Sequence, residues 1–259
     1  MDPKDGCALH KLAVELQKRF CPEIEGASKQ SAEPFVKTEK SKPEDNRPGI
    51  VNAPLDFELK GLDAEHPYLY GRGFTAETIK HFGLGFCSRG MLKDRVAIPL
   101  HDYEGKLVGY AGRVIDNALI NEENPRYRFP GSRTRDGKLC EFRKTLFLYN
   151  GFRFKTALDE LIVVDSFTSV WWLTQNGLPH AVATMGSDVS DEQGALIVGL
   201  VTPKGRVWIL SDGDPAGERF ALSSLLKISP HRLVRWVRLG DGRQPTDVAG
   251  ERLKEILGR

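Results

Sequence analysis

From about residue 158 onward, short continuous apolar runs alternate with amphipathic segments. Continuous apolar runs predict strands buried on both faces, and the amphipathic segments between them predict helices. This alternation is typical of an α/β fold with a mainly parallel sheet and helices on both faces. The predicted strands are ELIVVDS (160–166), HAVATM (180–185), RVWILSD (206–212) and RLVRWVRL (232–239), and the predicted helices are FTSVWWLTQNG (167–177), SDEQGALIVGL (190–200), PAGERFALSSLL (215–226) and PTDVAGERLKEIL (245–257).

The preceding stretch has a different pattern, typical of a smaller mixed α+β unit. Residues 64–87 predict two short helices, the second capped by Thr75 and closed by Gly83. RVAIPLHD (95–102) and KLVGYAGRVI (106–115) predict two strands joined by a hairpin turn. PRYRFPGSRTRDGK (125–138) predicts a basic loop or edge strand.

The first fifty residues lack a globular pattern. Residues 6–20 have one apolar stripe and predict an amphipathic helix too short to be stable alone. Residues 22–50 are rich in Pro, Lys, Glu and Ser and predict a disordered linker. The predicted organisation is an N-terminal helix (1–21), a linker (22–50), a basic subdomain (51–155) and an α/β domain (156–259).

Composition narrows the class of protein. Of the 259 residues, 40% are hydrophobic and 28% are charged, as in ordinary globular proteins. No apolar run approaches the roughly 18 residues of a membrane span, and the N-terminus lacks a signal-peptide pattern. The four cysteines are scattered without metal-site spacing, which predicts free thiols and no zinc site. We therefore expect a cytoplasmic chain without a membrane partner.

Positive charge is concentrated in one region, although the formal net charge is only +2. Residues 126–155 contain nine Lys or Arg and two acidic residues. Such an excess suits a polyanion such as nucleic acid, and it equally suits a solvated surface. The charge pattern alone leaves both interpretations open.

Acidic residues follow three of the predicted strands. Asp165, Asp212 with Asp214, and Asp247 all come where a strand ends, and the carboxyl ends of parallel strands meet at one sheet edge. Carboxylates packed together repel one another unless a cation intervenes, and hard oxygen ligands suit Mg²⁺ or Mn²⁺. The alternative is structural, because Asp214 precedes Pro215 as a helix N-cap does. Capping accounts for Asp214 and leaves Asp212 unexplained.

These motifs resemble a known family. VVDSFTSVWWLTQNG, AVATMGSDVSDEQ and VWILSDGDPAGERFAL, in this order, resemble the Toprim domain, whose most specific element is the DxD motif before a helix. YLYGRGFTAETIKHFGLGF, DRVAIPLHDYEGKLVGYAGRVI, NPRYRFPGS and LGDGRQPTDV resemble the catalytic core of bacterial replicative primases. The resemblance covers residues 62–255. It implies a Toprim domain preceded by a primase-type subdomain, in a chain lacking the CHC-type zinc-binding domain, of which residues 6–20 would be the tail.

The resemblance also implies functional residues. Asp165, Asp212 and Asp214 would be catalytic and, with Asp247, would hold Mg²⁺ or Mn²⁺. The positions implied to contact template or nucleotide are Arg95, Arg113, Arg126, Tyr127 and Arg128. The implied partners are a single-stranded DNA template and nucleoside triphosphates, with a helicase or a separately encoded zinc-domain protein as a further possibility.

Three acidic positions depart from the family pattern. Asp165 replaces a glutamate, and Ser169 and Gln244 stand where acidic residues are common. Three hypotheses therefore remain. The first is a primase-like nucleotidyltransferase from a mobile element, in the cytoplasm and associated with the nucleoid. The second is a catalytically degenerate core that binds single-stranded nucleic acid or a replication partner. The third is a Toprim metal-dependent nuclease.

Overall fold

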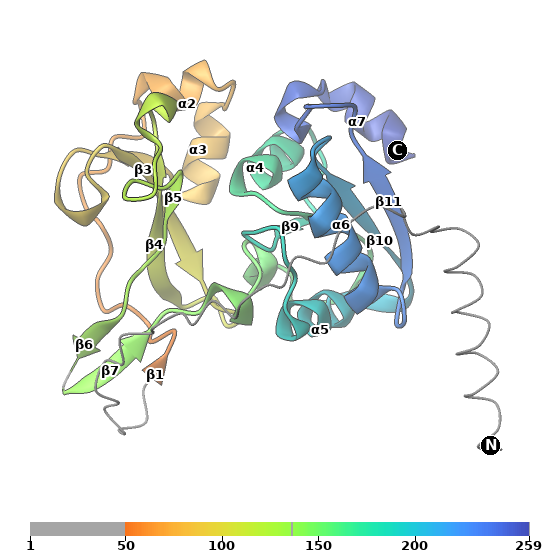
Figure 1. Cartoon of the computed structure of the whole chain (residues 1–259), viewed down its shortest axis with the longest axis horizontal. Helices are drawn as coiled ribbons and strands as arrows, with labels where there is room; N and C mark the ends of the chain where they lie inside the picture. The colour runs from red at the N-terminus through yellow and green to blue at the C-terminus, as the bar shows by residue number, and fades with distance from the viewer. Residues whose placement is uncertain (1–49, 136, 259) are drawn as a thin grey trace, which may run out of the picture. The chain divides into compact units, whose positions relative to one another are not determined.

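A four-stranded parallel sheet forms the carboxyl-terminal half of the chain (Figure 1). This computed structural model describes residues 50–135 and 137–258. The strand order is β11-β10-β8-β9, and all three pairings are parallel, as predicted. The strands are β8 (Leu158–Val164), β9 (Ala181–Ala183), β10 (Val201–Ser211) and β11 (Leu233–Arg238). The predicted helix 6–20 and the predicted linker lie outside the described residues, apart from Ile50.

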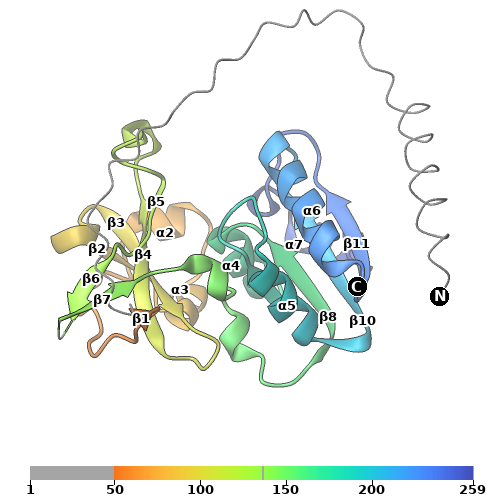
Figure 2. The same cartoon turned by 60° about the horizontal axis from the view of Figure 1, so that its bottom comes forward.

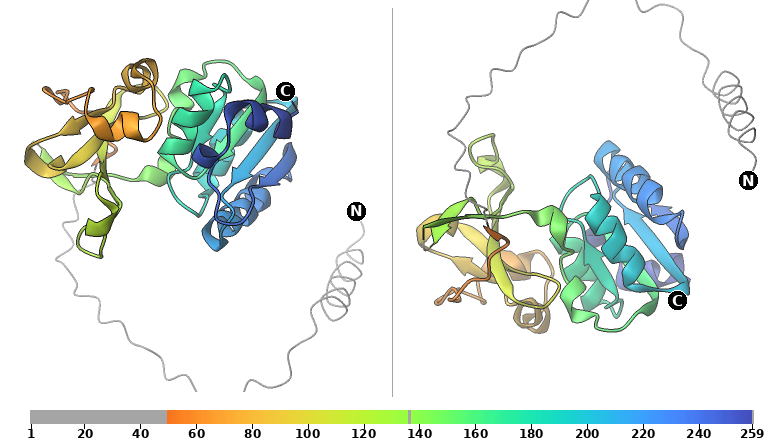
Figure 3. Two further views of the ribbon diagram at one scale, coloured as in Figure 1. Left: turned by 90° about the horizontal axis from the view of Figure 1, so that it is seen from above. Right: turned by 90° about the horizontal axis from the view of Figure 1, so that it is seen from below.

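Helices cover both faces of this sheet (Figures 2 and 3). Buried side chains of α5 and α6 pack with alternate residues of β8 and β10 on one face, and those of α4 and α7 pack on the other. The helices are α4 (Phe167–Gln175), α5 (Asp191–Gly199), α6 (Pro215–Ile228) and α7 (Gly250–Ile256). The predicted α/β fold is confirmed.

The prediction of one continuous helix over residues 245–257 is wrong, because the structure divides this segment into two elements. A 3₁₀ turn, η5 (Pro245–Asp247), comes first, and Val248 is extended at φ −114° and ψ 129°. The Val248 carbonyl accepts a hydrogen bond of 2.9 Å from the Trp172 indole, so it is unavailable to a continuing helix. At Gly250 a Cβ would lie 2.1 Å from Oδ1 of Asn176. The interruption between η5 and α7 therefore results from contacts with Trp172 of α4 and with Asn176, which directly follows α4.

The smaller unit is built on an antiparallel sheet of order β2-β3-β4-β5. The predicted hairpin is its centre, and the two predicted helices precede it, with the Thr75 side chain as N-cap and Gly83 left-handed at φ 63°. The elements are α2 (Pro67–Gly71), α3 (Ala76–Phe82), β2 (Gly85–Cys87), β3 (Arg95–His101), β4 (Leu107–Val114) and β5 (Tyr127–Arg128).

A three-stranded sheet of order β1-β7-β6 lies beside this unit. The basic segment 125–138, predicted as a loop or an edge strand, contributes β5 and β6 and leads into β7. The strands are β1 (Ile50–Val51), β6 (Arg133–Arg135) and β7 (Lys138–Glu141). Four further 3₁₀ turns connect the elements: η1 (Gly90–Leu92), η2 (Asn117–Leu119), η3 (Lys144–Leu146) and η4 (Gly151–Arg153).

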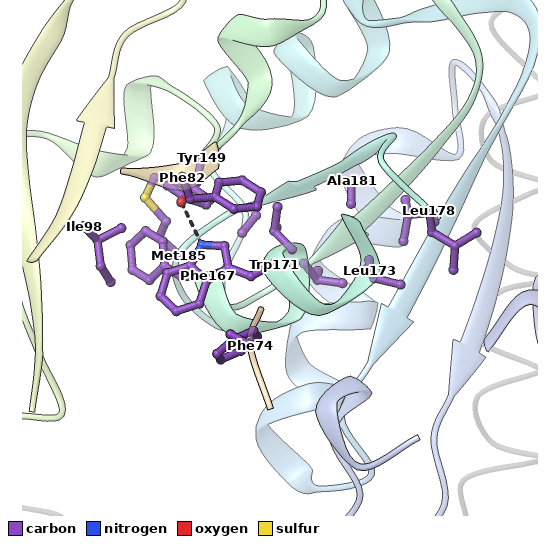
Figure 4. Close-up of a cluster of buried hydrophobic side chains, with 14 of the residues drawn as sticks. Phe74, Phe82, Ile98, Tyr149, Phe167, Trp171, Leu173, Leu178, Ala181 and Met185 are labelled. Atoms are coloured by element: carbon purple, nitrogen blue, oxygen red, sulfur yellow. Dashed lines mark hydrogen bonds between the residues drawn. The ribbon is translucent and has the colours of Figure 1, made fainter. Parts of the chain in front are cut away.

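One apolar cluster crosses from the smaller unit to the parallel sheet. It joins Ile98 of β3 and Phe82 of α3 to Phe167 and Trp171 of α4 (Figure 4). The Tyr149 ring contacts Phe82 and Phe167, and its hydroxyl accepts a 2.8 Å hydrogen bond from the Trp171 indole. Residues 47–259 accordingly form one compact unit, so contacts cross the predicted boundary at residue 155. Within the described part, no helix combines the length and apolar character needed to cross a bilayer.

Candidate active site at the carboxyl edge of the parallel sheet

Asp165 and Asp212 stand at equivalent places on two paired strands. Asp165 directly follows β8, and Asp212 directly follows β10. Because β8 and β10 are parallel neighbours, both residues are at the carboxyl edge of the sheet, where α/β proteins bind their ligands. Both side chains are half-buried.

Two glycine contacts shape the DxD segment. A Cβ on Gly213 would lie 1.9 Å from the carbonyl oxygen of Gly240, and one on Gly217 would lie 2.3 Å from that of Asp212. Gly213 N–H also donates to the Arg243 carbonyl at 2.9 Å. The loop after β11 is therefore held against the DxD segment, and that loop leads directly to Asp247 in η5.

The four predicted carboxylates interact electrostatically. Burial, reinforced by Asp165, Asp214 and Asp247, raises the pKa of Asp212 to about 7. Burial, reinforced by Asp214, raises the pKa of Asp165 to about 6. Repulsion of this kind among half-buried carboxylates marks candidate functional sites.

Two of the carboxylates have local structural partners. Asp214 is the N-cap of α6, and its Oδ1 accepts a 2.7 Å hydrogen bond from Gly217 N–H. Oδ2 of the exposed Asp247 accepts a 2.8 Å hydrogen bond from Gln244 N–H. The capping alternative for Asp214 is thus present in the structure. A cap uses one oxygen of a carboxylate and leaves the other for a second partner.

Asp212 has the strongest need for a cation. Its Oδ1 is buried and has no hydrogen-bond partner in the described structure. A buried carboxylate oxygen without a partner is costly, and a divalent ion would satisfy it. Within the described residues, no three His, Cys, Asp or Glu side chains are already grouped closely enough to hold a metal. The unpartnered Oδ1 of Asp212 fits a divalent ion, and a shared site of Asp165, Asp212, Asp214 and Asp247 stays a prediction.

Ser169 and Gln244, the two neutral residues where the family pattern has acidic ones, are at least partly buried. Ser169 is buried, and its hydroxyl lies 2.8 Å from that of Ser166, the N-cap of α4. Gln244 is half-buried at the start of η5. Neutral groups therefore occupy both positions, which lowers the negative charge of the site.

The predicted basic residues separate into two groups. Arg126 and Arg128 are exposed, and the Arg126 guanidinium lowers the pKa of Asp212, opposing the effect of the other carboxylates. Arg126 thus lies close enough to the acidic edge to act on it. The Arg128 guanidinium also donates a 3.4 Å hydrogen bond to the Met91 carbonyl.

Arg95 and Arg113 are buried and engaged in internal hydrogen bonds. Arg95 donates to the Gly112 and Pro125 carbonyls, both at 2.9 Å, and to Asn124. Arg113 donates to the hydroxyls of Tyr68 and Tyr127. All of these partners lie in the smaller unit, and the predicted role of the two arginines in binding nucleic acid stays a prediction.

Tyr127 connects the basic segment to the parallel-sheet domain. Its ring centre lies 5.2 Å from that of Phe167, the first residue of α4, and its hydroxyl accepts from Arg113. The pairing of β5 with β4 fixes its backbone. Tyr127 thus positions the Arg126 backbone relative to the start of α4.

Sequence reasoning did not single out Lys144. This half-buried residue donates a 2.6 Å hydrogen bond to the carbonyl of Met185, two residues beyond β9, and its ammonium lies over the Phe129 ring at 5.1 Å. Burial lowers the pKa of Lys144. Met185 itself is left-handed, at φ 61°. The only feature of the sequence that pointed toward Lys144 was the excess of basic residues in the segment 126–155.

Comparisons with known proteins point to one class. The chain is 27% identical over 245 residues to the DNA primase of Pseudomonas aeruginosa, an alignment that covers 76% of this chain and 35% of that protein. It is 28% identical over 200 residues to the DNA primase of Staphylococcus aureus, covering 72% of this chain and 30% of the relative. The chain thus spans about a third of these curated relatives. No protein-family model matches it.

Solved structures give the same result. A DNA primase domain from Pseudomonas aeruginosa superposes with a TM-score of 0.62 and 25% identity, covering 76% of this chain and 71% of that one. A primase catalytic domain bound to single-stranded DNA superposes with a TM-score of 0.62 and 23% identity, covering 75% and 71%, which speaks for the fold alone. The chain is therefore similar in sequence to DNA primases, and its parallel sheet beside a smaller antiparallel one has the Toprim-containing fold of a primase catalytic core.

Proposed function

We propose that the chain is a primase-like nucleotidyltransferase that joins nucleotides on a single-stranded DNA template with the help of a divalent metal ion. The observation that carries the proposal is the acidic edge, where Asp165 and Asp212 follow paired parallel strands and the buried Oδ1 of Asp212 has no hydrogen-bond partner in the described structure. The positive charge of the exposed Arg126 also acts on Asp212. A site of this kind offers a cation for phosphate beside carboxylates for a metal ion. The likeness to DNA primases supports the choice of reaction.

Each residue has a distinct part in this proposal. Asp212 and Asp165 would hold Mg²⁺ or Mn²⁺, with Asp214 and Asp247 near enough to add negative charge. The ion, when bound, would neutralise triphosphate charge and favour attack by a 3′-hydroxyl. Arg126 and Arg128 would bind phosphates of the template or nucleotide, and Tyr127 would hold Arg126 in place. Arg95 and Arg113 would support the segment from within.

A second candidate function is a binding module without catalysis. The neutral Ser166–Ser169 hydroxyl pair and the neutral Gln244 favour it, because both lower the charge available to a metal ion. In that case Arg126 and Arg128 would still bind single-stranded nucleic acid. The third hypothesis, a nuclease, uses the same metal chemistry for strand cleavage.

Primer synthesis tests the proposal directly. Labelled nucleotides, a mixed single-stranded template and Mg²⁺ or Mn²⁺ would be incubated with wild type, with Asp212→Asn, and with Asp241→Asn as a matched control. Asp241 is an exposed acid of the neighbouring loop, paired with Arg238 at 3.1 Å. We expect Asp212→Asn to lose product about a hundredfold or more, since it removes a metal ligand, and Asp241→Asn to retain it.

Other outcomes would select another function. Salt-sensitive template binding by a wild type that makes no product would establish the binding module. Cleavage of a labelled strand that Asp212→Asn abolishes would establish the nuclease. The nucleoside triphosphates, a helicase or a separate zinc-domain protein as partner, association with the nucleoid and a mobile-element origin are finer proposals that depend on the first outcome.

A further inference from the structure

A second surface of the smaller unit has the opposite charge to its basic segment, residues 126–155. Residues 55–65 carry Asp56, Glu58, Asp63 and Glu65 against the single Lys60. We call this segment the outer acidic face. It extends between β1 and α2, in orange, along the side of the small sheet away from the parallel sheet (Figure 1).

Backbone contacts hold the outer acidic face across the sheet. Leu55 N–H donates to the Leu107 carbonyl at 2.7 Å, Leu59 N–H donates to the Tyr110 hydroxyl at 3.1 Å, and Asp63 forms a bridge with Phe86 of β2. Side chains alternate between the two faces of a strand, and Ile98 of β3 points into the core. Its neighbour Pro99, and Tyr110 opposite Pro99 on β4, therefore point to the other face of the sheet. The outer acidic face is therefore a fixed layer over the sheet.

Two hollows flank this layer. One, of ≈ 470 Å³, has Leu62, Tyr70, Ile79 and Leu84 among its lining residues, with Glu65 and Lys80 beside them. The other, of ≈ 300 Å³, is lined by Leu55, Phe57 and Leu107 with Asp56 and Glu58. Phe57 is 55% exposed and Tyr70 41%. Large apolar side chains beside carboxylates are typical of a surface that buries an apolar anchor.

The carboxylates are only partly engaged inside the chain. Asp56 pairs with Arg135 at 3.1 Å, and Asp63 accepts from Glu65 N–H. Among the described residues, the carboxylates of Glu58 and Glu65 have no ion-pair partner. A polyanion would be repelled here, whereas a cationic chain would be attracted.

We propose that the outer acidic face binds a basic amphipathic segment of another protein. Leucine or aromatic side chains of that segment would enter the two hollows, and its Lys or Arg residues would meet Glu58 and Glu65. Binding there would leave Arg126 and Arg128 free for nucleic acid, so the partner and the template could be held together.

A displayed library of random peptides, selected on the immobilised full chain, tests this proposal. We expect enriched peptides to combine Lys or Arg with Leu, Phe or Trp, and to bind more weakly at high salt. The double variant Glu58→Lys/Glu65→Lys should weaken binding at least tenfold. Ala76→Gln, which adds an uncharged side chain at the rim of the larger hollow, should weaken it too. Glu192→Lys on α5 is the matched charge-reversal control and should bind as wild type does.

Four results would overturn the proposal: no enriched peptide, enriched peptides without basic residues, equal binding by the double variant, or displacement of the peptide by a single-stranded oligonucleotide. The last would assign the surface to nucleic acid. Circular dichroism of each variant separates loss of binding from loss of folding. Because peptide binding is measured without nucleotides or metal, its failure is independent of primer synthesis.

Discussion

At the scale of single residues, the Asp212 carboxylate couples stability to pH. Its pKa of about 7 lies above the value near 4 of an unfolded aspartate, so the folded protein binds a proton more tightly. The contribution of Asp212 is therefore most favourable below about pH 4 and is lost as pH rises toward 7. Without metal, the carboxylate destabilises the fold at neutral pH, and a bound divalent ion would offset this.

The first prediction follows from this sign. In EDTA at pH 8, Asp212→Asn should raise the free energy of unfolding by roughly 1–2 kcal/mol, once solvent screening of the half-buried group is allowed for. The gain should vanish near pH 4. Mg²⁺ should stabilise wild type and leave the variant unchanged. Chemical denaturation at several pH values measures all three, and a variant no more stable than wild type at pH 8 would refute the repulsion.

Asp214 permits a second prediction, because its two roles differ in chemistry. Asp214→Asn retains an N-cap oxygen for Gly217 N–H and should change stability little, whereas Asp214→Ala should cost about 1 kcal/mol. Both should reduce the stabilisation by Mg²⁺ if the free oxygen serves a metal ion. Thermal unfolding with and without Mg²⁺ distinguishes the roles. An undiminished Mg²⁺ effect in both variants would leave Asp214 as a cap alone.

Residue type and spacing predicted some of this site and not the rest. Asp before Pro at the start of an amphipathic run is a local pattern, and α6 begins there. The burial of Arg95 depends on Gly112, Asn124 and Pro125, which the fold brings to it from β4 and the loop before β5. No local pattern encodes such a contact. The contact of Arg95 with nucleic acid, which the resemblance implies, stays a prediction, and the structure adds its hydrogen-bond partners inside the protein.

At the scale of elements, β3 begins with the buried Arg95, whereas the exposed Arg126 directly precedes β5, and the third prediction compares the two arginines. Arg95→Ala leaves buried carbonyls unsatisfied and should cost about 3 kcal/mol of stability. Arg126→Ala should leave stability nearly unchanged, weaken oligonucleotide binding and reduce the salt dependence of log K by about one. Denaturation and fluorescence anisotropy at several salt concentrations measure these effects. Strong destabilisation by Arg126→Ala would contradict the assignment of a structural role to Arg95 and a binding role to Arg126.

The apolar pattern predicted an element well where the element's own sequence encodes it. The apolar runs of β8, β9 and β10 are buried, whereas β11, at the edge of the sheet, has only half-buried and exposed side chains. All four strands were found in their predicted order along the chain. The break between η5 and α7 has no such signal, because it depends on the Trp172 indole reaching Val248 from α4. Short strands such as β1, of two residues, exist only through pairing with β7.

At the scale of the whole molecule, the shared apolar cluster predicts a single unfolding transition for the two sheets. All four tryptophans lie after residue 156, so their fluorescence reports the parallel-sheet domain. Hydrogen exchange of β3 and β4 reports the smaller unit. Phe167→Ala, which removes a buried ring from the shared cluster, should lower both stabilities together by about 3–5 kcal/mol. Separate transitions in wild type would show that the two units unfold independently.

The same cluster also fixes the basic segment relative to the acidic edge. Phe167, Trp171 and Tyr149 are nearly fully buried, and exposing rings of this size costs several kcal/mol each. Swinging the basic segment away from the acidic edge as a rigid body would therefore cost about as much as unfolding the domain. The position of the basic segment relative to the acidic edge is thus set by the core. Under the proposed function, a template would bind to a site whose two halves are already in place.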